Sequence, residues 1–561
     1  MVQLLISAIK SFSFKERMVF WMAFVFFVIS SISLSFFFIE KSTVKVPASG
    51  GEFIEGVVGQ PAFINPVLAK PGTVDDDLVA LTFANLLDLS ESLKSEKNFK
   101  IWTLRLKENA RWQDETPITS DDVIFTIQAI QDPDVLSPLF SDWQNIKVSR
   151  VSEREIRFEL PTSYSLFENL LKKLRPIPKK IFADIAPANI KLSSYNLEPF
   201  GSGPFLYEKM ERKKDGFISQ FQLKINPAYR SIGSLPYLKR FTFHFFENEE
   251  GLIEAYNSGI IDGFLATDYS LIDKIEINSL TEKIPTTKYY ALFFNPNANP
   301  ILESKEIRKA LQLATDINSL INQEFKGYAL LEAGPIPPTL PSYNKEIEKD
   351  VSFNPSLAKE LIANAGWIFN PEINLWQKVE KNNSTQELAV ILKTPDTPLL
   401  LRMAQRIQKD WQAIGIKTEI EKYDPALLGE EIIKNRDYQI LLFGNIVSLE
   451  PDLFSFWHST ERFYPGLNLS FFNDSLTDNL IALSRQVAPQ DPQRNKLLFQ
   501  IQERITSELG ALFLVNPQYL YIHRASRPQV VIETLSLASD RFEKVNQWHI
   551  KTKRKFKGIQ L

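Results

Sequence analysis

The sequence predicts an α/β fold of two lobes with mixed sheets, preceded by one membrane-spanning helix. Three observations lead to this prediction: an uncharged apolar stretch near the N-terminus, a strand–turn–helix unit at 102–130, and strands that are apolar throughout, such as YQILLF at 438–443. Strands of the last kind suit a sheet that is covered on both faces. A chain of 561 residues is long enough for two to four domains and a large core.

The composition excludes several classes of protein. The chain has no cysteine, so disulfides, thiolate metal sites and lipidation through a cysteine are ruled out. Its net charge of −3 is small for this length and shows no footprint of nucleic-acid binding. We therefore expect no nucleic-acid partner.

The N-terminal apolar stretch, Met18–Ile39, holds 22 residues without a charge. As a helix it spans about 33 Å, enough for a hydrocarbon core of about 30 Å. Lys10, Lys15 and Arg17 precede it, so the positive-inside rule predicts a cytoplasmic N-terminus. We expect 1–45 to comprise a cytoplasmic N-terminal segment and a transmembrane helix at 18–39 that is retained as an anchor. The chain would cross the cell membrane once, with the rest of it on the extracytoplasmic side. The alternative is a signal peptide cleaved within VPASG at 46–50.

The unit at 102–130 combines a strand, a polar turn and a helix. Trp102, Leu104 and Leu106 alternate with polar residues, which predicts a strand with one buried face. Thr119 and Asp122 are spaced like a capping box with Asp in place of Glu, and apolar residues then follow at helical spacing. Local structure accounts for these residues, and none of them requires catalysis.

A second unit predicts one long amphipathic helix over 304–327. Ser304 is a good N-cap, an apolar stripe runs from Ile307 to Phe325, and Gly327 ends the helix. A helix that stops at Gly415 before an alternating strand repeats the α/β pattern.

The segment TLRLKENARWQDETPITSDDVIFTIQAI at 103–130 resembles the signature of the oligopeptide/dipeptide/nickel-binding family of ABC-importer solute-binding proteins, bacterial solute-binding protein family 5. Asn109, Glu115 and Ser120 depart from the family pattern, which affects only turn detail. Further matches follow in order: GGEFIEGVVGQPAFINPVLA at 50–69, FGSGPFLYEK at 200–209, INPAYRSIGSLPYLKRFTFHFF at 225–246, LIEAYNSGIIDG at 252–263, YYALFFNPNANPILESKEIRKALQLATDINSLI at 289–321, NPSLAKELIANAGW at 354–367, IQKDWQAIGIKTEI at 407–420 and YQILLFGNIVSLEPDLF at 438–454.

The resemblance implies a periplasmic-binding-protein-like fold. Lobe one would comprise 46–80, 200–290 and 525–561, with an extra subdomain inserted at 81–199, and lobe two would comprise 291–524. The chain would cross between the lobes near 288–297 and 515–526. A hinge there would close the lobes over a ligand.

The resemblance also places residues in the cleft between the lobes: Pro61, Phe63, Asn65, Asn445, Val447, Trp457 and Asn468. Peptide-binding members usually carry an aspartate four residues before the proline of the cleft turn, and it pairs with the α-amine of the ligand. Val447 stands at this position before Pro451, so that ion pair cannot form there. Glu450 and Asp452 are the alternatives, although both lie beyond that position. For each aromatic residue of the set, core packing competes with ligand contact.

The resemblance implies a binding protein and not an enzyme: the anchored substrate-binding component of an ABC importer, which passes peptides to permease subunits and has a monomeric ectodomain. The alternatives are another solute, such as a glycan or a metal chelate, a surface receptor or interaction module on the same fold, and an uncharacterised surface hydrolase. No cofactor or metal is implied, because the four histidines lack metal-binding spacing and no nucleophile motif stands out. The basic tail KTKRKFKG at 551–558 is either a solvated end or a contact for anionic lipid headgroups.

Overall fold

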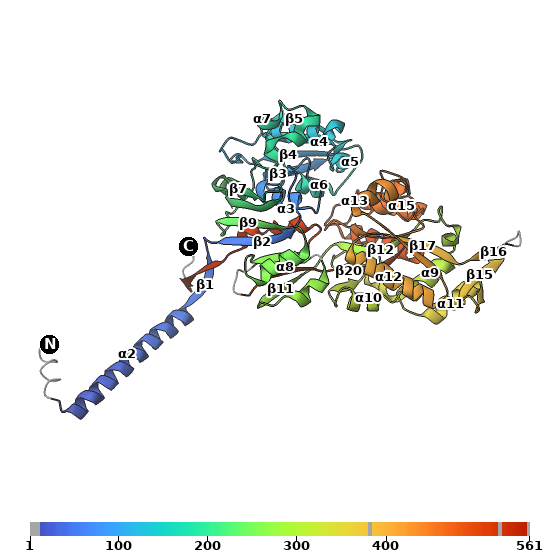
Figure 1. Ribbon diagram of the computed structural model, residues 1–561. Helices are drawn as coiled ribbons and strands as arrows, with labels where there is room; N and C mark the ends of the chain where they lie inside the picture. Colours follow the sequence, from blue (N-terminus) through green and yellow to red (C-terminus); the bar gives the residue numbers. More distant parts are fainter. Residues whose placement is uncertain (1–11, 267, 380–383, 526–529, 558–561) are drawn as a thin grey trace.

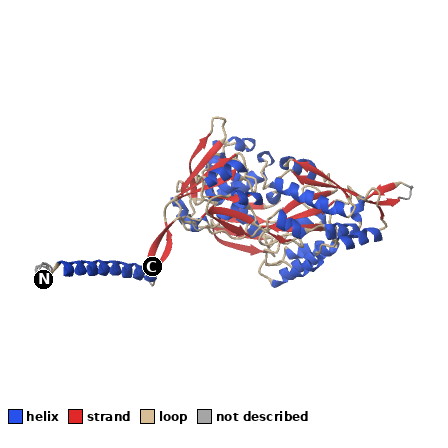
Figure 2. Ribbon diagram, turned by 60° about the horizontal axis from the view of Figure 1, so that its bottom comes forward, coloured by secondary structure: helices blue, strands red, loops and turns tan. Residues whose placement is uncertain are grey.

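The computed structural model describes residues 12–266, 268–379, 384–525 and 530–557. Two lobes lie side by side, and a long helix projects away from lobe one together with a two-stranded ribbon (Figure 1). Helices cover the sheets of both lobes (Figure 2). The predicted α/β architecture with one N-terminal apolar helix is confirmed.

Lobe one is built on a seven-stranded sheet in the order β11-β21-β10-β2-β9-β8-β7. Strand β2 runs parallel to both of its neighbours, β9 and β10. Helices α3 (Val74–Thr82) and α8 (Glu249–Asn257) pack nearby. The strands are β2 (Glu52–Val58), β7 (Phe205–Arg212), β8 (Ile218–Ile225), β9 (Arg240–Phe246), β10 (Gly263–Ala266), β11 (Ser279–Ile284) and β21 (Tyr519–Arg524).

The inserted subdomain is a four-stranded antiparallel sheet in the order β3-β4-β6-β5, with short helices around it. The unit at 102–130 supplies β4 and α4, and the N–H of Thr119 donates to the Asp122 carboxylate at 2.9 Å, so the predicted capping box is present. The elements are β3 (Ser90–Glu96), β4 (Ile101–Leu106), α4 (Ser120–Gln131), α5 (Phe140–Trp143), β5 (Lys147–Ser152), β6 (Glu155–Glu159), α6 (Phe167–Lys173) and α7 (Lys179–Phe182).

Lobe two contains a six-stranded mixed sheet in the order β13-β20-β12-β19-β17-β18 and a small sheet of β14, β15 and β16. Its strands are β12 (Lys288–Phe294), β13 (Ala329–Leu331), β14 (Ile368–Asn370), β15 (Leu375–Val379), β16 (Thr385–Glu387), β17 (Ala389–Pro395), β18 (Lys417–Tyr423), β19 (Ile440–Ile446) and β20 (Ala511–Pro517). Its helices are α9 (Lys305–Ala314), α10 (Ile317–Gln323), α11 (Pro355–Asn364), α12 (Pro398–Ala413), α13 (Pro425–Leu427), α14 (Phe454–Trp457), α15 (Ser475–Ser484) and α16 (Pro492–Ser507).

The single helix predicted over 304–327 is wrong in one respect, because the structure divides it into α9 and α10. Ser304 caps α9 as predicted, since its hydroxyl accepts from the N–H of Ile307 at 3.2 Å. Asp316 then starts a new helix by accepting from the N–H of Ser319 at 3.0 Å. An Asp that competes for backbone N–H groups favours a cap over a helix interior, whereas the apolar period runs on through the break.

The N-terminal helix α2 (Phe14–Ser42) is longer than the predicted 18–39, because Ser13 and Glu16 form a capping box ahead of the apolar stretch. None of its residues is buried against the protein. The chain continues directly into β1 (Thr43–Ala48), which pairs antiparallel with β22 (Lys551–Phe556). These two strands form the basic ribbon, so the basic tail is a strand beside the end of α2 (Figure 1).

In the FGSGPF segment, Gly203 stands where the backbone passes close to the end of α3. The N–H of Gly203 donates to the carbonyl of Thr82 at 2.8 Å. A Cβ added at Gly203 would lie 2.5 Å from the carbonyl carbon of Thr82 and 2.6 Å from the oxygen of Leu81. This contact attaches the end of the inserted segment to α3.

We expect Gly203→Ala to lower the free energy of unfolding by about 1–3 kcal/mol or more, because backbone atoms cannot move aside as side chains do. Gly429→Ala is the matched control, since no heavy atom lies within 4 Å of its added Cβ. Urea unfolding of both variants measures the difference. Equal stability of the two would contradict the close-approach explanation.

Candidate functional site

The chain crosses between the lobes twice, and the two crossings lie side by side. The first is at 285–287, between β11 and β12, and the second is at Gln518, between β20 and β21. The Thr286 hydroxyl donates to the carbonyl of Pro517 at 2.6 Å, and the Asn516 amide donates to the carbonyl of Thr286 at 2.9 Å. The side chains of Thr286 and Asn516 are buried, so these bonds join the crossings into one unit.

Residues 535–541 connect this crossing to both lobes. The N–H of Thr287 donates to the carbonyl of Leu535 at 2.9 Å, and the hydroxyls of Thr287 and Ser536 lie 3.1 Å apart. On the lobe-one side, Ser539 donates to Asp76 of α3 at 2.7 Å. The Ser536 hydroxyl also lies 3.5 Å from the carbonyl of Val447, just after β19. The segment thus runs from the end of β19 to lobe one, and we call it the floor.

Arg541 ends this floor in a buried ion cluster with Glu55 of β2 and Asp77 of α3. Its guanidinium donates to Glu55 at 2.5 and 3.0 Å and to Asp77 at 2.6 and 2.7 Å. Tyr521 donates to the second oxygen of Glu55 at 2.7 Å. Burial raises the pKa of the Glu55 carboxyl, and the charge of Arg541 opposes that rise.

A cavity of about 340 Å³ adjoins the ion cluster at the carboxyl end of β2. Ligands of α/β sheets bind beyond the carboxyl ends of parallel strands, and β2 lies between two parallel neighbours. The lining includes Glu55, Gly59, Thr73, Asp77, Leu252 and Arg541.

The lobe-one residues predicted for the cleft lie in the loop that follows β2. Pro61 and Asn65 are buried, and Phe63 is 37% exposed. Asp75 holds the loop by accepting from the N–H groups of Ala62 and Phe63 at 2.7 and 3.0 Å. The Asn65 amide donates to Asn196 at 3.0 Å, so of the three predicted residues Phe63 is the one with an exposed side chain.

Two of the lobe-two residues predicted for the cleft, Asn445 and Val447, lie at the end of β19 and just after it. Asn445 is buried and donates to the hydroxyl of Tyr289 at 3.0 Å. Val447 is 1% exposed, and its N–H donates to the carbonyl of Thr287 at 3.1 Å. Ile446 and Leu449, which the sequence analysis did not single out, are 37% and 41% exposed.

Trp457 and Asn468 lie inside lobe two. Trp457 is 1% exposed, and its ring lies 5.7 Å from that of Phe513 and 5.9 Å from that of Phe472. The Asn468 amide donates to the carbonyls of His458 and Phe472 and accepts from the N–H of Phe472. Contact between a ligand and any of the seven predicted residues stays a prediction.

Glu450 and Asp452 already have basic partners within lobe two. Arg494 lies 3.4 Å from the Glu450 carboxylate, and Arg485 lies 3.3 Å from that of Asp452. The same turn contacts the inserted subdomain, because Asn169 donates to the carbonyl of Glu450 at 3.3 Å. The backbone of this turn therefore joins the subdomain to lobe two, and both carboxylates have arginine partners.

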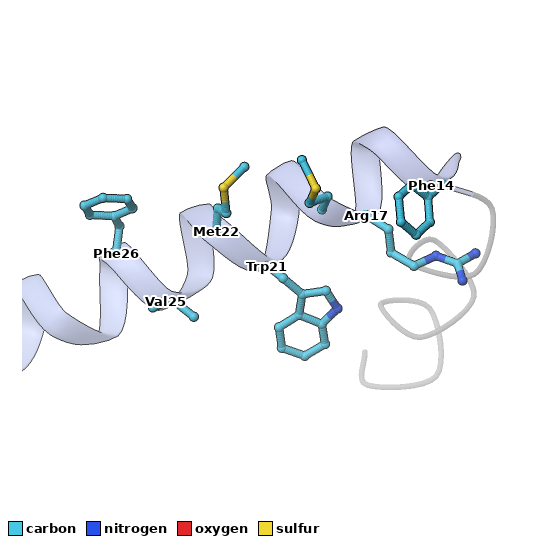
Figure 3. Close-up of a pocket in the computed structure, with 7 residues that line it drawn as sticks. Phe14, Arg17, Trp21, Met22, Val25 and Phe26 are labelled. Carbon is cyan, nitrogen blue, oxygen red and sulfur yellow. The ribbon is translucent and has the colours of Figure 1, made fainter.

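A hollow of about 540 Å³ lies along α2, which projects away from both lobes (Figure 1). Every residue that lines it comes from this one helix, and the labelled apolar side chains point outward from it (Figure 3). Such a groove is the surface of a membrane-span candidate and not a cleft between lobes. Among the described residues, no cluster of His, Asp and Glu side chains has the geometry to hold a metal ion.

The sequence analysis missed the Arg541 cluster. One signal was present in β2, where Phe53, Glu55 and Val57 share a face, so that a charged residue stands on a buried face. Glu55 and Asp77 precede Arg541 by 486 and 464 residues, so no sequence spacing indicates that the three residues meet.

Residues 87–463 match the bacterial extracellular solute-binding proteins, family 5 Middle. The oligopeptide-binding protein AppA of Bacillus subtilis is 25% identical over 495 residues, which cover 85% of this chain and 88% of that protein. Its structure in complex with a nonapeptide superposes with a TM-score of 0.72 at 22% identity, covering 90% of this chain and all of that one. NikZ from Campylobacter jejuni, in complex with Ni(L-His), gives a TM-score of 0.69 at 21% identity, with coverage of 89% and 99%.

We expect Arg541→Ala to lower the free energy of unfolding by about 3–5 kcal/mol, because it leaves two buried carboxylates without their cation. Lys544→Ala is the control, since Lys544 pairs with Glu533 at the surface. Burial raises the pKa of Glu55 in the folded chain, so Glu55 is protonated up to a higher pH than in the unfolded chain. A protonated Glu55 carries no charge that the missing guanidinium would have to balance. The loss should therefore be smaller at pH 5 than at pH 8 in urea unfolding. A loss that is the same at both pH values would argue against the ion cluster.

Proposed function

The chain belongs to the bacterial extracellular solute-binding proteins of family 5, and from this we propose that it is the membrane-anchored, peptide-binding component of an ABC importer. Proteins of this family bind solutes and do not catalyse reactions. The observation that carries the peptide assignment is the likeness, over 85% of the chain, to a protein named for oligopeptide binding. We infer that the bound peptide is then delivered to permease subunits of the importer.

The arrangement of the two lobes supports a ligand between them. Strand β2 of lobe one and strand β19 of lobe two each have a parallel neighbour, and both lie beside the floor formed by 535–541. Exposed apolar side chains stand at or shortly after the ends of these strands: Phe63 in lobe one, Ile446 and Leu449 in lobe two. Among the described residues, the backbone N–H groups of 448–450 donate no hydrogen bond to the protein. Free backbone groups beside apolar side chains suit an extended peptide. We propose that rotation about 285–287 and Gln518 closes the lobes over it.

The turn after β19 supports recognition without the amine of the peptide. Val447 is apolar and buried, and the carboxylates of Glu450 and Asp452 lie beside arginines. A ligand ammonium buried at this turn would lack a partner, and an unpaired buried charge is costly. The site would then bind peptides through backbone and side-chain contacts.

We expect the N-terminal amine of the peptide to contribute little to its affinity. The peptide that the purified chain retains, identified by native mass spectrometry, should bind about equally well with a free and an acetylated N-terminus, as measured by calorimetry. Asp452→Asn should leave this ratio unchanged, because Arg485 already occupies that carboxylate. A tenfold loss on acetylation, about 1.4 kcal/mol, would show that an acidic residue elsewhere holds the amine. Retention of a solute other than a peptide would refute the peptide assignment.

Two features of the structure support retention of the anchor. Helix α2 is apolar and none of its residues is buried, so in water it would expose a large apolar surface. Cleavage within 46–50 would also cut β1, which pairs with β22 along its whole length. A retained helix keeps this ribbon intact.

We therefore expect the protein extracted from its membrane to have the intact mass of a chain that includes α2, and to stay in the pellet after a carbonate wash. A substitution of Val28 and Ile29 by Asp should release it, because charges at the centre of a span are costly to bury in lipid. Asp at Leu192 and Leu136, which are exposed on the inserted subdomain, is the control. A mature N-terminus near Ser49 would refute the anchor.

A further inference from the structure

The basic ribbon concentrates positive charge in a protein that is negative overall. Residues 40–48 and 551–557 contain seven basic residues and one acidic residue, Glu40, whereas the whole chain has a net charge of −3. Arg554 lies 3.9 Å from Glu40 and donates to the Thr43 hydroxyl at 3.1 Å. The basic residues are Lys41, Lys45, Lys551, Lys553, Arg554, Lys555 and Lys557.

The pairing of the strands places like charges together. Lys45 lies directly opposite Arg554, and such pairs destabilise a two-stranded sheet. Lys551, Lys553 and Lys555 alternate along β22, so they share the other face with the small apolar residues of β1. Lys551 and Lys553 are exposed, as is Phe556. A counter-charge from outside the chain would relieve this repulsion.

The ribbon begins where α2 ends. The N–H of Lys557 donates to the carbonyl of Ser42, the last residue of α2, at 2.8 Å, and Phe556 pairs with Thr43. Met18–Ile39 fills a hydrocarbon core of about 30 Å, so Glu40 and the residues after it start at headgroup level. Each residue along a strand adds about 3.4 Å, so Lys555 lies close to the membrane and Lys551 about 14 Å farther out.

We propose that the basic ribbon binds the headgroups of anionic phospholipids on the extracytoplasmic side of the membrane. This inference rests on the proposed anchoring by α2, which sets the height of the ribbon. Charges within about 8 Å of an anionic surface experience its potential at physiological ionic strength, so Lys45, Arg554, Lys555 and Lys557 should bind most strongly. Phe556 lies among them and presents an exposed apolar side chain at the same level.

The test uses the full chain in vesicles of phosphatidylcholine alone or with 30% phosphatidylglycerol, and a membrane-impermeant amine reagent read out by mass spectrometry. We expect Lys555 and Lys557 to label at least fivefold more slowly in the anionic vesicles, with a smaller effect at Lys551 and recovery in 1 M salt. Lys94 and Lys97 of the inserted subdomain, which lies away from α2, are controls in the same molecule (Figure 1).

A second measurement follows the lipid. The chain has no cysteine, so a dye on Thr552→Cys reports energy transfer to labelled phosphatidylglycerol at a single site. K553Q/K555Q/K557Q should remove the preference for the anionic lipid, and K94Q/K97Q/K147Q should keep it. Equal labelling in both vesicles with the chain still anchored would overturn the ribbon proposal alone. Release of the chain by carbonate would refute the anchor, and with it the ribbon's place at the membrane. Protection from labelling in native membranes but not in anionic vesicles would indicate that the ribbon binds an acidic protein. That result would overturn the proposal of lipid binding.

Discussion

The buried guanidinium of Arg541 is the interaction on which the arrangement of lobe one depends. It binds a strand from the start of the lobe and a helix from the edge of the inserted segment, through Glu55 and Asp77. Only a charge of this kind compensates two carboxylates that are both removed from water. Because Arg541 also ends the floor segment, the same ion cluster fixes the position of Ser536 against the crossing strands. The loop after β2, the floor and the hinge are therefore held in one frame.

Two groups of contacts join the lobes: one between the two crossing strands, and one between the inserted subdomain and lobe two. The crossing strands share buried hydrogen bonds at Thr286 and Asn516, and they stay together in any rotation of the lobes. Between the inserted subdomain and lobe two, the backbone N–H of Ser165 donates to the carbonyl of Arg485 at 2.8 Å, and the Arg485 guanidinium lies 4.6 Å from the ring of Tyr164. Ser165 is buried, and the Arg485 side chain is 24% exposed, so these contacts are partly shielded from water. Opening the lobes would break them, and the cation–π contact alone is worth about 0.5–2 kcal/mol.

Local features of the fold could be predicted, and features that depend on distant pairs could not. Thr119 and Asp122 define a helix start within four residues, and the structure places it there. The break at Asp316 was missed because the hydrophobic period passes through it, and only the competition of its side chain for an N–H shows the break. For the candidate site, the strand ends were identified through family motifs, but the burial of Val447 and the pairing of Asp452 depend on residues far along the chain.

The ribbon also bears on how the chain acquires its orientation. Topology is decided by basic residues near the ends of a span while it inserts, and β22 is about 500 residues away from α2 in synthesis. In the proposed topology, the lysines of β22 would therefore not compete with Lys15 and Arg17 when the helix enters the membrane. They would reach the outer flank only once the rest of the chain had folded and β22 had paired with β1. Folding would thus give the protein a positive outer flank that the orientation rule would oppose if those residues followed the helix directly.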